Sequence, residues 1–276
     1  LYFTPYHNGD EFSGEVLRYD TTKEFESVEA WSTFDPSKNG VGYDATGYWG
    51  GTFDGHYVYF SPDWNFDEDE EVSVPHGEVL RYDTTKEFES VEAWSTFDAS
   101  KNGVGYDPRE YLNAVFDGKS IYFAPLSNKD GKSHGEVLRY DTTKEFESAQ
   151  AWSTFDASKN GVGNDPRGYD GVIFDGKFVY FSPRNHDSDY HGEVLRYDTT
   201  KDFESAQAWS TFDPSKNGVG NNPKGFGDGI FDGKFVYFSP FHNGEDHHGE
   251  VLRYDTTKDF ESVEAWSTFD PSKNGV

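Results

Sequence analysis

The sequence predicts an all-β protein, a five-bladed β-propeller with four antiparallel strands in each blade. Three observations support this prediction: one unit is repeated five times, each unit holds four strand patterns, and helical periodicity is nowhere sustained. The repeat is aligned on the Arg of "LRYD", at Arg18, Arg81, Arg139, Arg196 and Arg253, with spacings of 63, 58, 57 and 57 residues. Four-stranded units repeated radially are typical of propellers, whereas a two-sheet sandwich gives no reason to repeat one unit five times.

The fourth unit shows each element in order. "GVIF" (171–174) is a short apolar strand that runs into Asp175-Gly176, a signal for a tight hairpin. "FVYFSP" (178–183) is the second strand, and it ends at a Pro that has no N–H to donate. "GEVLRYD" (192–198) and "AWSTFD" (208–213) are the third and fourth strands, and the segment between them has room for one helical turn.

A single domain of five units is expected over residues 1–276. The units span 1–42, 43–105, 106–163, 164–220 and 221–276. The first-strand pattern occurs in four units only, because residues 1–3 already read as the end of a second strand. We expect residues upstream of Leu1 to complete the first unit; the alternatives are a strand donated by another chain or one short blade.

The pattern "VFDGKSIYF" (115–123), "VLRYD" (137–141) and Trp152 resembles a kelch-type blade. The resemblance covers nearly the whole of each unit and implies the same strand order. Ser-Pro, Ala-Pro or Thr-Pro stands where kelch blades carry a Gly-Gly pair, so no functional residue is carried over. The repeats are also similar to those of uncharacterised bacterial propellers.

Composition excludes several classes of function. The net charge is −27, which argues against nucleic acid and against membrane as partners and favours cations, basic surfaces or neutral polar ligands. The absence of Cys excludes disulfides, thiolate metal sites and a Cys nucleophile. The chain has no Met, even at position 1, and no apolar membrane-length run; we interpret it as a processed or partial product and expect a secreted, extracellular protein.

The loops between second and third strands are the parts that differ between units. They cover residues 6–13, 63–76, 126–134, 184–191 and 241–248, and they are rich in Asp, Glu, Asn and His. Variable loops on a rigid frame are where binding usually occurs, although drift after duplication would also make them differ. Tyr6, Trp64, Tyr190 and Phe241 are predicted to stack on sugar rings.

The loops between fourth and first strands emerge on the same rim and predict a second ring of ligand-binding residues at the channel mouth. These residues are the aromatics Tyr48, Tyr111, Tyr169 and Phe226 and the cations Arg109, Arg167 and Lys224. The cations could bind an anion or a carboxylated sugar. The alternative, which we favour, is that they pair with neighbouring Asp107 and Asp165 and line a water-filled channel.

Ca²⁺ is a candidate cofactor, because Asp187 and Asp189 and the acidic run 67–71 offer hard oxygen ligands. Neither segment matches the full EF-hand pattern. A solvated acidic loop is the alternative that we favour.

Four His at equivalent places are expected to make a structural hydrogen bond at the start of the third strand, because blades radiate outward and keep them too far apart for one metal ion. They are His76, His134, His191 and His248. The Arg of "LRYD" is expected to form a blade-to-blade ion pair with the Asp two residues on.

We expect a non-enzymatic, lectin-like protein that binds a carbohydrate or another small polar ligand multivalently through one rim. The alternative is a structural or interaction protein that assembles with itself into an oligomer or filament, with Ca²⁺ as a candidate requirement. A glycosidase is the main enzymatic alternative, but the repeated carboxylates occur in near-identical copies and mark no single catalytic pair.

Overall fold

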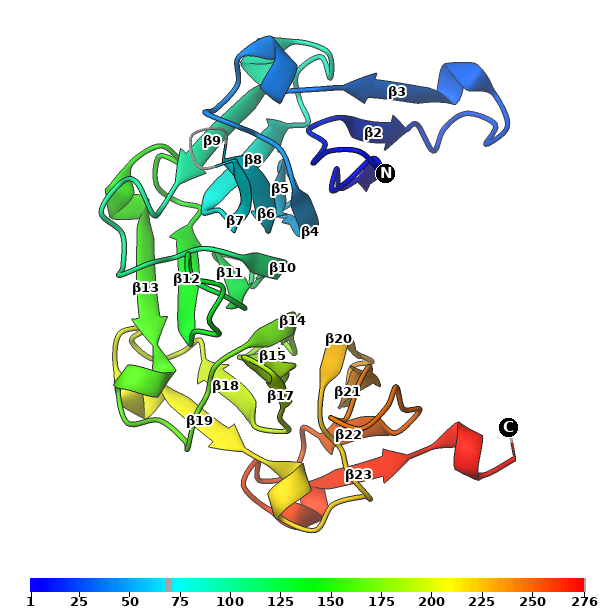
Figure 1. Cartoon of the computed structure of the whole chain (residues 1–276), viewed down its shortest axis with the longest axis vertical. Helices are drawn as coiled ribbons and strands as arrows, with labels where there is room; N and C mark the ends of the chain where they lie inside the picture. The colour runs from blue at the N-terminus through cyan, green and yellow to red at the C-terminus, as the bar shows by residue number, and fades with distance from the viewer. Residues whose placement is uncertain (68–70, 276) are drawn as a thin grey trace.

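The computed structural model describes residues 1–67 and 71–275 and shows five antiparallel sheets side by side along an arc (Figure 1). The first sheet has the order β1-β2-β3, with β1 (Tyr2–Phe3), β2 (Val16–Tyr19) and β3 (Trp31–Phe34). The second is β4-β5-β8-β9, with β4 (Tyr48–Phe53), β5 (Tyr57–Pro62), β8 (Glu78–Asp83) and β9 (Trp94–Asp98). The third is β10-β11-β12-β13, with β10 (Tyr111–Phe116), β11 (Ser120–Pro125), β12 (Glu136–Asp141) and β13 (Trp152–Asp156).

The last two four-stranded sheets follow the same order. The fourth is β14-β15-β18-β19, with β14 (Tyr169–Phe174), β15 (Phe178–Pro183), β18 (Val194–Asp198) and β19 (Trp209–Phe212). The fifth is β20-β21-β22-β23, with β20 (Phe226–Phe231), β21 (Phe235–Pro240), β22 (Val251–Asp255) and β23 (Trp266–Phe269). Each predicted unit therefore contains one sheet, and strands within a sheet are joined in chain order.

The remaining elements are short. In two units the loop between second and third strands forms a hairpin that the sequence did not predict: β6 (Trp64–Asp67) with β7 (Val72–Pro75), and β16 (Asn185–His186) with β17 (Asp189–Tyr190). The expected helical turn is a 3₁₀ turn before each fourth strand, at Val28–Ala30, Val91–Ala93, Ala149–Ala151, Ala206–Ala208 and Val263–Ala265. Further 3₁₀ turns span Ser37–Asn39, Ala157–Lys159, Pro214–Lys216 and Pro271–Lys273. No helix among the described residues has the length and apolarity that crossing a membrane requires.

The hairpin turns form as the sequence predicts. In the fourth sheet the Asp175 carboxylate accepts hydrogen bonds from the backbone N–H of Lys177 and Phe178 at 2.8 and 2.7 Å, and from the Tyr180 hydroxyl at 2.7 Å. Gly176 has a φ of 100°, which a residue with a side chain rarely adopts. Asp and Gly are thus both needed for this connection.

Neighbouring sheets are held together by aromatic pairs that recur along the arc. Between the third and fourth sheets, Phe155 stacks on Trp209 with ring centroids 4.9 Å apart, and Tyr122 contacts Tyr197 at 5.5 Å. The same Phe–Trp pair recurs as Phe34–Trp94, Phe97–Trp152 and Phe212–Trp266. Both faces of an inner sheet are therefore covered by its neighbours, as is expected of adjacent propeller blades.

The Arg of "LRYD" also joins neighbouring sheets, but by a different contact from the one predicted. The Arg139 guanidinium lies over the Phe203 ring of the next sheet, 4.3 Å from its centroid, and its Nε donates to Ser153 Oγ. The Asp141 carboxylate instead accepts hydrogen bonds from Thr143 in its own turn. The expected Arg–Asp pair is wrong because the turn already occupies the carboxylate, and cation–π stacking replaces it.

The first and last sheets each have one face that would contact a neighbouring sheet in the repeat but that no other sheet covers. Figure 1 shows that the arc does not close, so the two end sheets do not meet. Phe269 in the last sheet is 54% exposed, whereas the equivalent Phe155 is 4% exposed. Phe25 in the first sheet is 64% exposed, whereas the equivalent Phe146 is 2% exposed. Each end sheet therefore exposes an aromatic side chain whose equivalents in the inner sheets are buried.

The four His make the structural hydrogen bond that the sequence predicts. His76 Nε2 donates to the Gly47 carbonyl at 3.1 Å, and His134, His191 and His248 make the same bond to the carbonyls of Arg109, Gly168 and Lys224. Burial lowers the pKa of His76 to about 4 and that of His191 to about 3, so both rings are neutral at pH 7. These bonds tie the third strand to the loop that enters the first strand, on the rim where the binding residues were expected.

Candidate functional site

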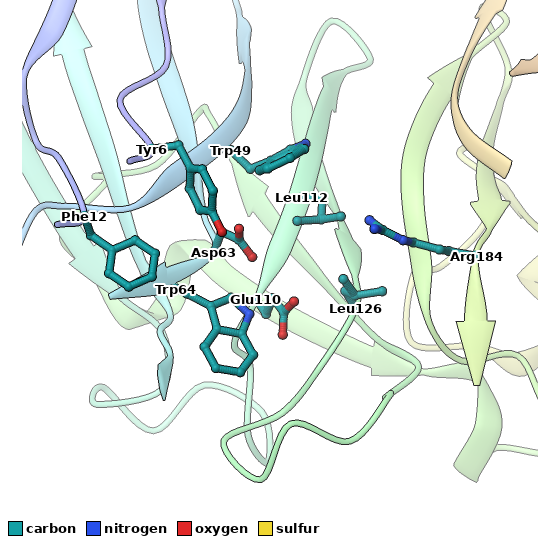
Figure 2. A pocket seen from close by; sticks show the side chains of 9 residues that line it. All are labelled: Tyr6, Phe12, Trp49, Asp63, Trp64, Glu110, Leu112, Leu126 and Arg184. Carbon is teal, nitrogen blue, oxygen red and sulfur yellow. The ribbon is translucent and has the colours of Figure 1, made fainter. Parts of the chain in front are cut away.

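A pocket of about 290 Å³ opens on this rim, beside the inner strands of the second and third sheets (Figure 2). Its lining residues are Tyr6, Phe12, Trp49, Asp63, Trp64, Glu110, Leu112, Leu126 and Arg184. They come from four of the five units, so the pocket exists only where the sheets are brought together.

Four lining residues occupy the same place in their units, directly after the Pro that ends the second strand. The residues after the five Pro are Tyr6, Asp63, Leu126, Arg184 and Phe241. The first four line the pocket, and the Phe241 ring lies under the Arg184 guanidinium, 5.0 Å away. Because Pro has no N–H to extend the ladder, the chain leaves the sheet here and this side chain is free to turn toward the axis.

A β-bulge brings in the lining residues of the inner strands. Tyr48 pairs with Pro62 and Gly51 with Phe60, so two residues of β4 face one residue of β5. The same shift occurs in β10, β14 and β20. The bulged segments carry Trp49 and Leu112, which line the pocket; bulges commonly redirect side chains next to functional sites.

The centre of the pocket is a pair of buried carboxyl groups, Asp63 and Glu110. They are only 3% and 4% exposed, and each affects the pKa of the other. Burial, reinforced by the negative charge of Glu110, raises the pKa of Asp63 to about 8. Burial also raises the pKa of Glu110, and burial together with Asp63 raises that of Tyr6. The pair therefore holds a proton at pH 7.

Glu110 has a backbone conformation that its repeat equivalents reserve for Gly. Its φ is +48°, and the equivalent Gly47, Gly168 and Gly225 have φ values of 70°, 72° and 60°. A Cβ at those glycines would overlap a backbone carbonyl oxygen of the neighbouring loop, whereas the third unit accommodates a side chain. A residue held in a left-handed conformation beside a pocket is a signature of function.

The cation in the pocket has its own partner. Arg184 Nη1 donates to Asp170 Oδ2 at 2.8 Å. Burial raises the pKa of Asp170 to about 6 despite this ion pair, and Asn113 Nδ2 donates to its Oδ1 at 3.4 Å. At pH 7 Arg184 and Asp170 therefore neutralise each other, and the free polarity of the pocket comes from Asp63 and Glu110.

We predict that Asp63→Asn stabilises the protein at pH 8 and has little effect at pH 4. The folded-state pKa of about 8 is far above the unfolded value of about 3.9, so the folded state keeps a proton that the unfolded state releases, and stability falls as the pH rises between these values. Asn resembles the protonated acid and removes this loss, which is worth about 5 kcal/mol at pH 8. Urea unfolding at both pH values measures the difference. Asp189→Asn, an exposed carboxylate, is the control; lower stability of Asp63→Asn at pH 8 would contradict the buried, protonated pair.

The structure separates the aromatic residues predicted on the rim into two groups. Tyr6 and Trp64 both line the pocket. Tyr190 and Phe241 lie outside its lining, with ring centroids 6.2 Å apart, and His242 stacks on Tyr190 at 4.6 Å. These four residues therefore do not form one continuous stacking surface.

The prediction that four aromatic residues at the channel mouth bind the ligand is wrong. Tyr48, Tyr111, Tyr169 and Phe226 are fully buried. Tyr111 and Tyr169 donate hydrogen bonds to the Glu136 and Glu193 carbonyls. Their rings begin the inner strands and fill the core, because the bulge turns the following residues, not these, toward the pocket.

Two of the three predicted cations form the ion pairs that the favoured alternative describes. Arg109 pairs with Asp107 at 2.8 Å, and Arg167 pairs with Asp165 at 2.6 Å. Neither Arg is in the pocket lining, nor is Lys224. Salt bridges satisfy both guanidinium groups, so the anion-binding prediction is not supported for them.

One of the two predicted Ca²⁺ ligands, Asp187, has another partner. Asp187 Oδ1 accepts a hydrogen bond from the Ser133 backbone N–H at 2.9 Å, and Asp189 is exposed. Residues 68–70 of the acidic run lie outside the described residues. Across the rest of the chain, no three acidic or His side chains are grouped to hold a metal ion.

Asp63, Glu110, Asp170 and Arg184 were not singled out from the sequence as site residues. A comparison of the units with each other would have pointed to all four. Glu110 replaces a Gly present in three other units, and Asp63 and Arg184 follow the Pro where each unit has a different residue. Asp170 also stands where the units differ, but only the bulge of β14 brings it beside Arg184.

Comparisons with known proteins support the fold and leave the function open. No protein-family model matches the chain, and no curated protein matches its sequence. Among solved structures, the chain is similar to YjhT, a kelch-repeat propeller, with a TM-score of 0.54 and 10% identity over 96% of this chain and 85% of that one. The likeness confirms the predicted β-propeller architecture with kelch-like blades. YjhT has six blades, so the likeness does not fix the number of blades in a complete ring.

Proposed function

We propose that the chain is a non-enzymatic, extracellular carbohydrate-binding protein and that its ligand occupies the pocket around Asp63 and Glu110. One observation carries the proposal: a buried carboxyl pair stands among the rings of Tyr6, Trp49 and Trp64 in a single pocket. Aromatic faces stack on sugar rings, and carboxylates accept hydrogen bonds from hydroxyl groups.

The proposal replaces several equivalent rim sites with one axial site. At the position after the Pro each unit carries a different residue, so the four units that line the pocket contribute different chemistry to it. Affinity then depends on this pocket and not on multivalency.

A glycan array followed by titration calorimetry tests the proposal. We expect the wild-type chain to bind at least one carbohydrate and Trp49→Ala to weaken it about tenfold, since stacking on a ring contributes on the order of 1 kcal/mol. Tyr106→Ala, an exposed aromatic outside the pocket, is the matched control. Absence of binding to every sugar, or equal affinities of the two variants, would refute the proposal.

Self-assembly is a second candidate function, favoured by the two uncovered end sheets. The last sheet presents Phe269 and Arg253, and the first presents Trp31 and Phe25, which are the two halves of the contact that joins every neighbouring pair of sheets. In this candidate each chain contributes five blades, and the last sheet of one copy packs on the first sheet of the next.

Light scattering over a range of protein concentrations tests assembly. We expect the mass to exceed that of one chain at high concentration, and Phe269→Glu to reduce it to that of the monomer. Phe66→Glu, which changes a similarly exposed Phe on the β6–β7 hairpin, should leave the mass unchanged. A monomeric wild-type chain at all concentrations would rule out this candidate.

A further inference from the structure

We propose that the ligand of the pocket carries a protonated amine, as an amino sugar does, and that the ammonium group binds between Asp63 and Glu110. This inference rests on the proposed carbohydrate-binding function and names the class of carbohydrate.

An acceptor without a donor marks the position of the amine. Glu110 Oε2 is buried and has no hydrogen-bond partner, although Trp64, Ser127 and Asp63 approach the carboxyl group. A buried carboxylate oxygen without a donor is costly, and function is a common reason for its retention. An ammonium group offers three donors and a positive charge, whereas a sugar hydroxyl offers one donor and no charge.

The rings around the carboxyl pair suit a cation as well. Tyr6, Trp49 and Trp64 surround Asp63 and Glu110 in Figure 2. Aromatic faces attract ammonium groups, most strongly when water is excluded, and combinations of rings with acidic groups recognise organic cations. The rings would therefore bind both the sugar face and its charged substituent.

The charges near the pocket do not oppose a cation. Arg184 is the cation in the lining, and its charge is matched by Asp170 at 2.8 Å. The net charge of −27 attracts cations to the whole molecule and raises their concentration near the rim.

Binding of an ammonium group displaces the proton of the carboxyl pair. The groups that face Asp63 are Glu110, Tyr6, Arg184 and Asp170. Of these, Glu110 shares the proton, and a positive charge between the two carboxyl groups lowers the pKa of both. Asp63 then releases its proton to the buffer, so binding at pH 7 is accompanied by release of up to one proton.

Titration calorimetry with glucosamine, N-acetylglucosamine, glucose and ethanolamine tests the inference at pH 7 in amine-free buffers of two ionisation enthalpies. We expect glucosamine to bind at least tenfold more tightly than N-acetylglucosamine, with proton release. In Glu110→Gln, which keeps the shape of the side chain, the preference should fall below about threefold, and Asp63→Asn should remove the proton release.

The outcomes separate this inference from the function on which it rests. Equal binding of the three sugars would overturn the amine inference and leave carbohydrate binding intact. Binding of ethanolamine without any sugar would refute carbohydrate binding and support the amine. Binding of neither glucosamine nor ethanolamine, or an unchanged preference in Glu110→Gln, would overturn the inference.

Discussion

Replacing Glu110 by Gly is expected to weaken binding of glucosamine at least tenfold without lowering the stability of the protein. The change gives the third unit the residue that three other units carry at this place, where φ is positive. A left-handed conformation costs a residue with a side chain about 1–2 kcal/mol, and Gly removes that strain. It also removes a buried carboxyl group whose pKa is raised by burial. These gains offset the greater flexibility of Gly in the unfolded chain, so the free energy of unfolding stays the same or rises by about 1 kcal/mol.

The loss of affinity has a separate cause. Without Glu110, the pocket keeps its rings but loses the acceptor that has no partner and one of the two negative groups. We expect affinity to fall at least tenfold in calorimetry, while urea unfolding shows no loss of stability. Glu110→Gln is the control that keeps the side-chain volume and the backbone strain. A marked loss of stability in Glu110→Gly would mean that the residue holds the loops together and is not retained for binding.

Phe155→Ala and Phe269→Ala should differ greatly in stability although they change the same residue of the repeat. Phe155 is buried against Trp209 of the next sheet, with the rings nearly parallel at 7°. Deleting a buried Phe side chain leaves a cavity and costs about 3–5 kcal/mol. Phe269 is 54% exposed, and its loss should cost less than about 0.5 kcal/mol.

Urea unfolding at pH 7 and low protein concentration measures both effects. The two variants share the mutated residue type and its local strand context, so the difference reports contact with the next sheet alone. A large effect of Phe269→Ala that appears only at high protein concentration would support the assembly of end sheets. Equal effects at every concentration would contradict the open arc.

The repeated strands and turns are nearly the same in each unit, whereas the pocket residues differ between units. The strands, the Asp-Gly turns and the inter-sheet stacks are nearly the same in each unit, so mutations there are expected to act mainly on stability. The pocket uses positions where the units differ, and at Glu110 it keeps a strained backbone and a buried acid. Stability is commonly sacrificed in this way where a site must bind.

The sequence by itself determined the strands, their order and the propeller architecture, because these depend on local sequence patterns that occur in up to five units. A hairpin needs Asp-Gly after the first strand, and the end of the second strand needs Pro, at fixed places in the units. Repetition made each pattern readable, and the structure confirms them.

Only the tertiary structure decided which side chains meet. Asp63 follows a strand of the second unit, and Glu110 precedes a strand of the third, so no local pattern relates them. They meet because adjacent sheets place these two connections on one rim. The same packing buries Tyr48 and its equivalents, which the sequence had assigned to the ligand. Burial also raises the pKa of Asp63, since removal of water from a carboxylate depends on neighbours that come from other units.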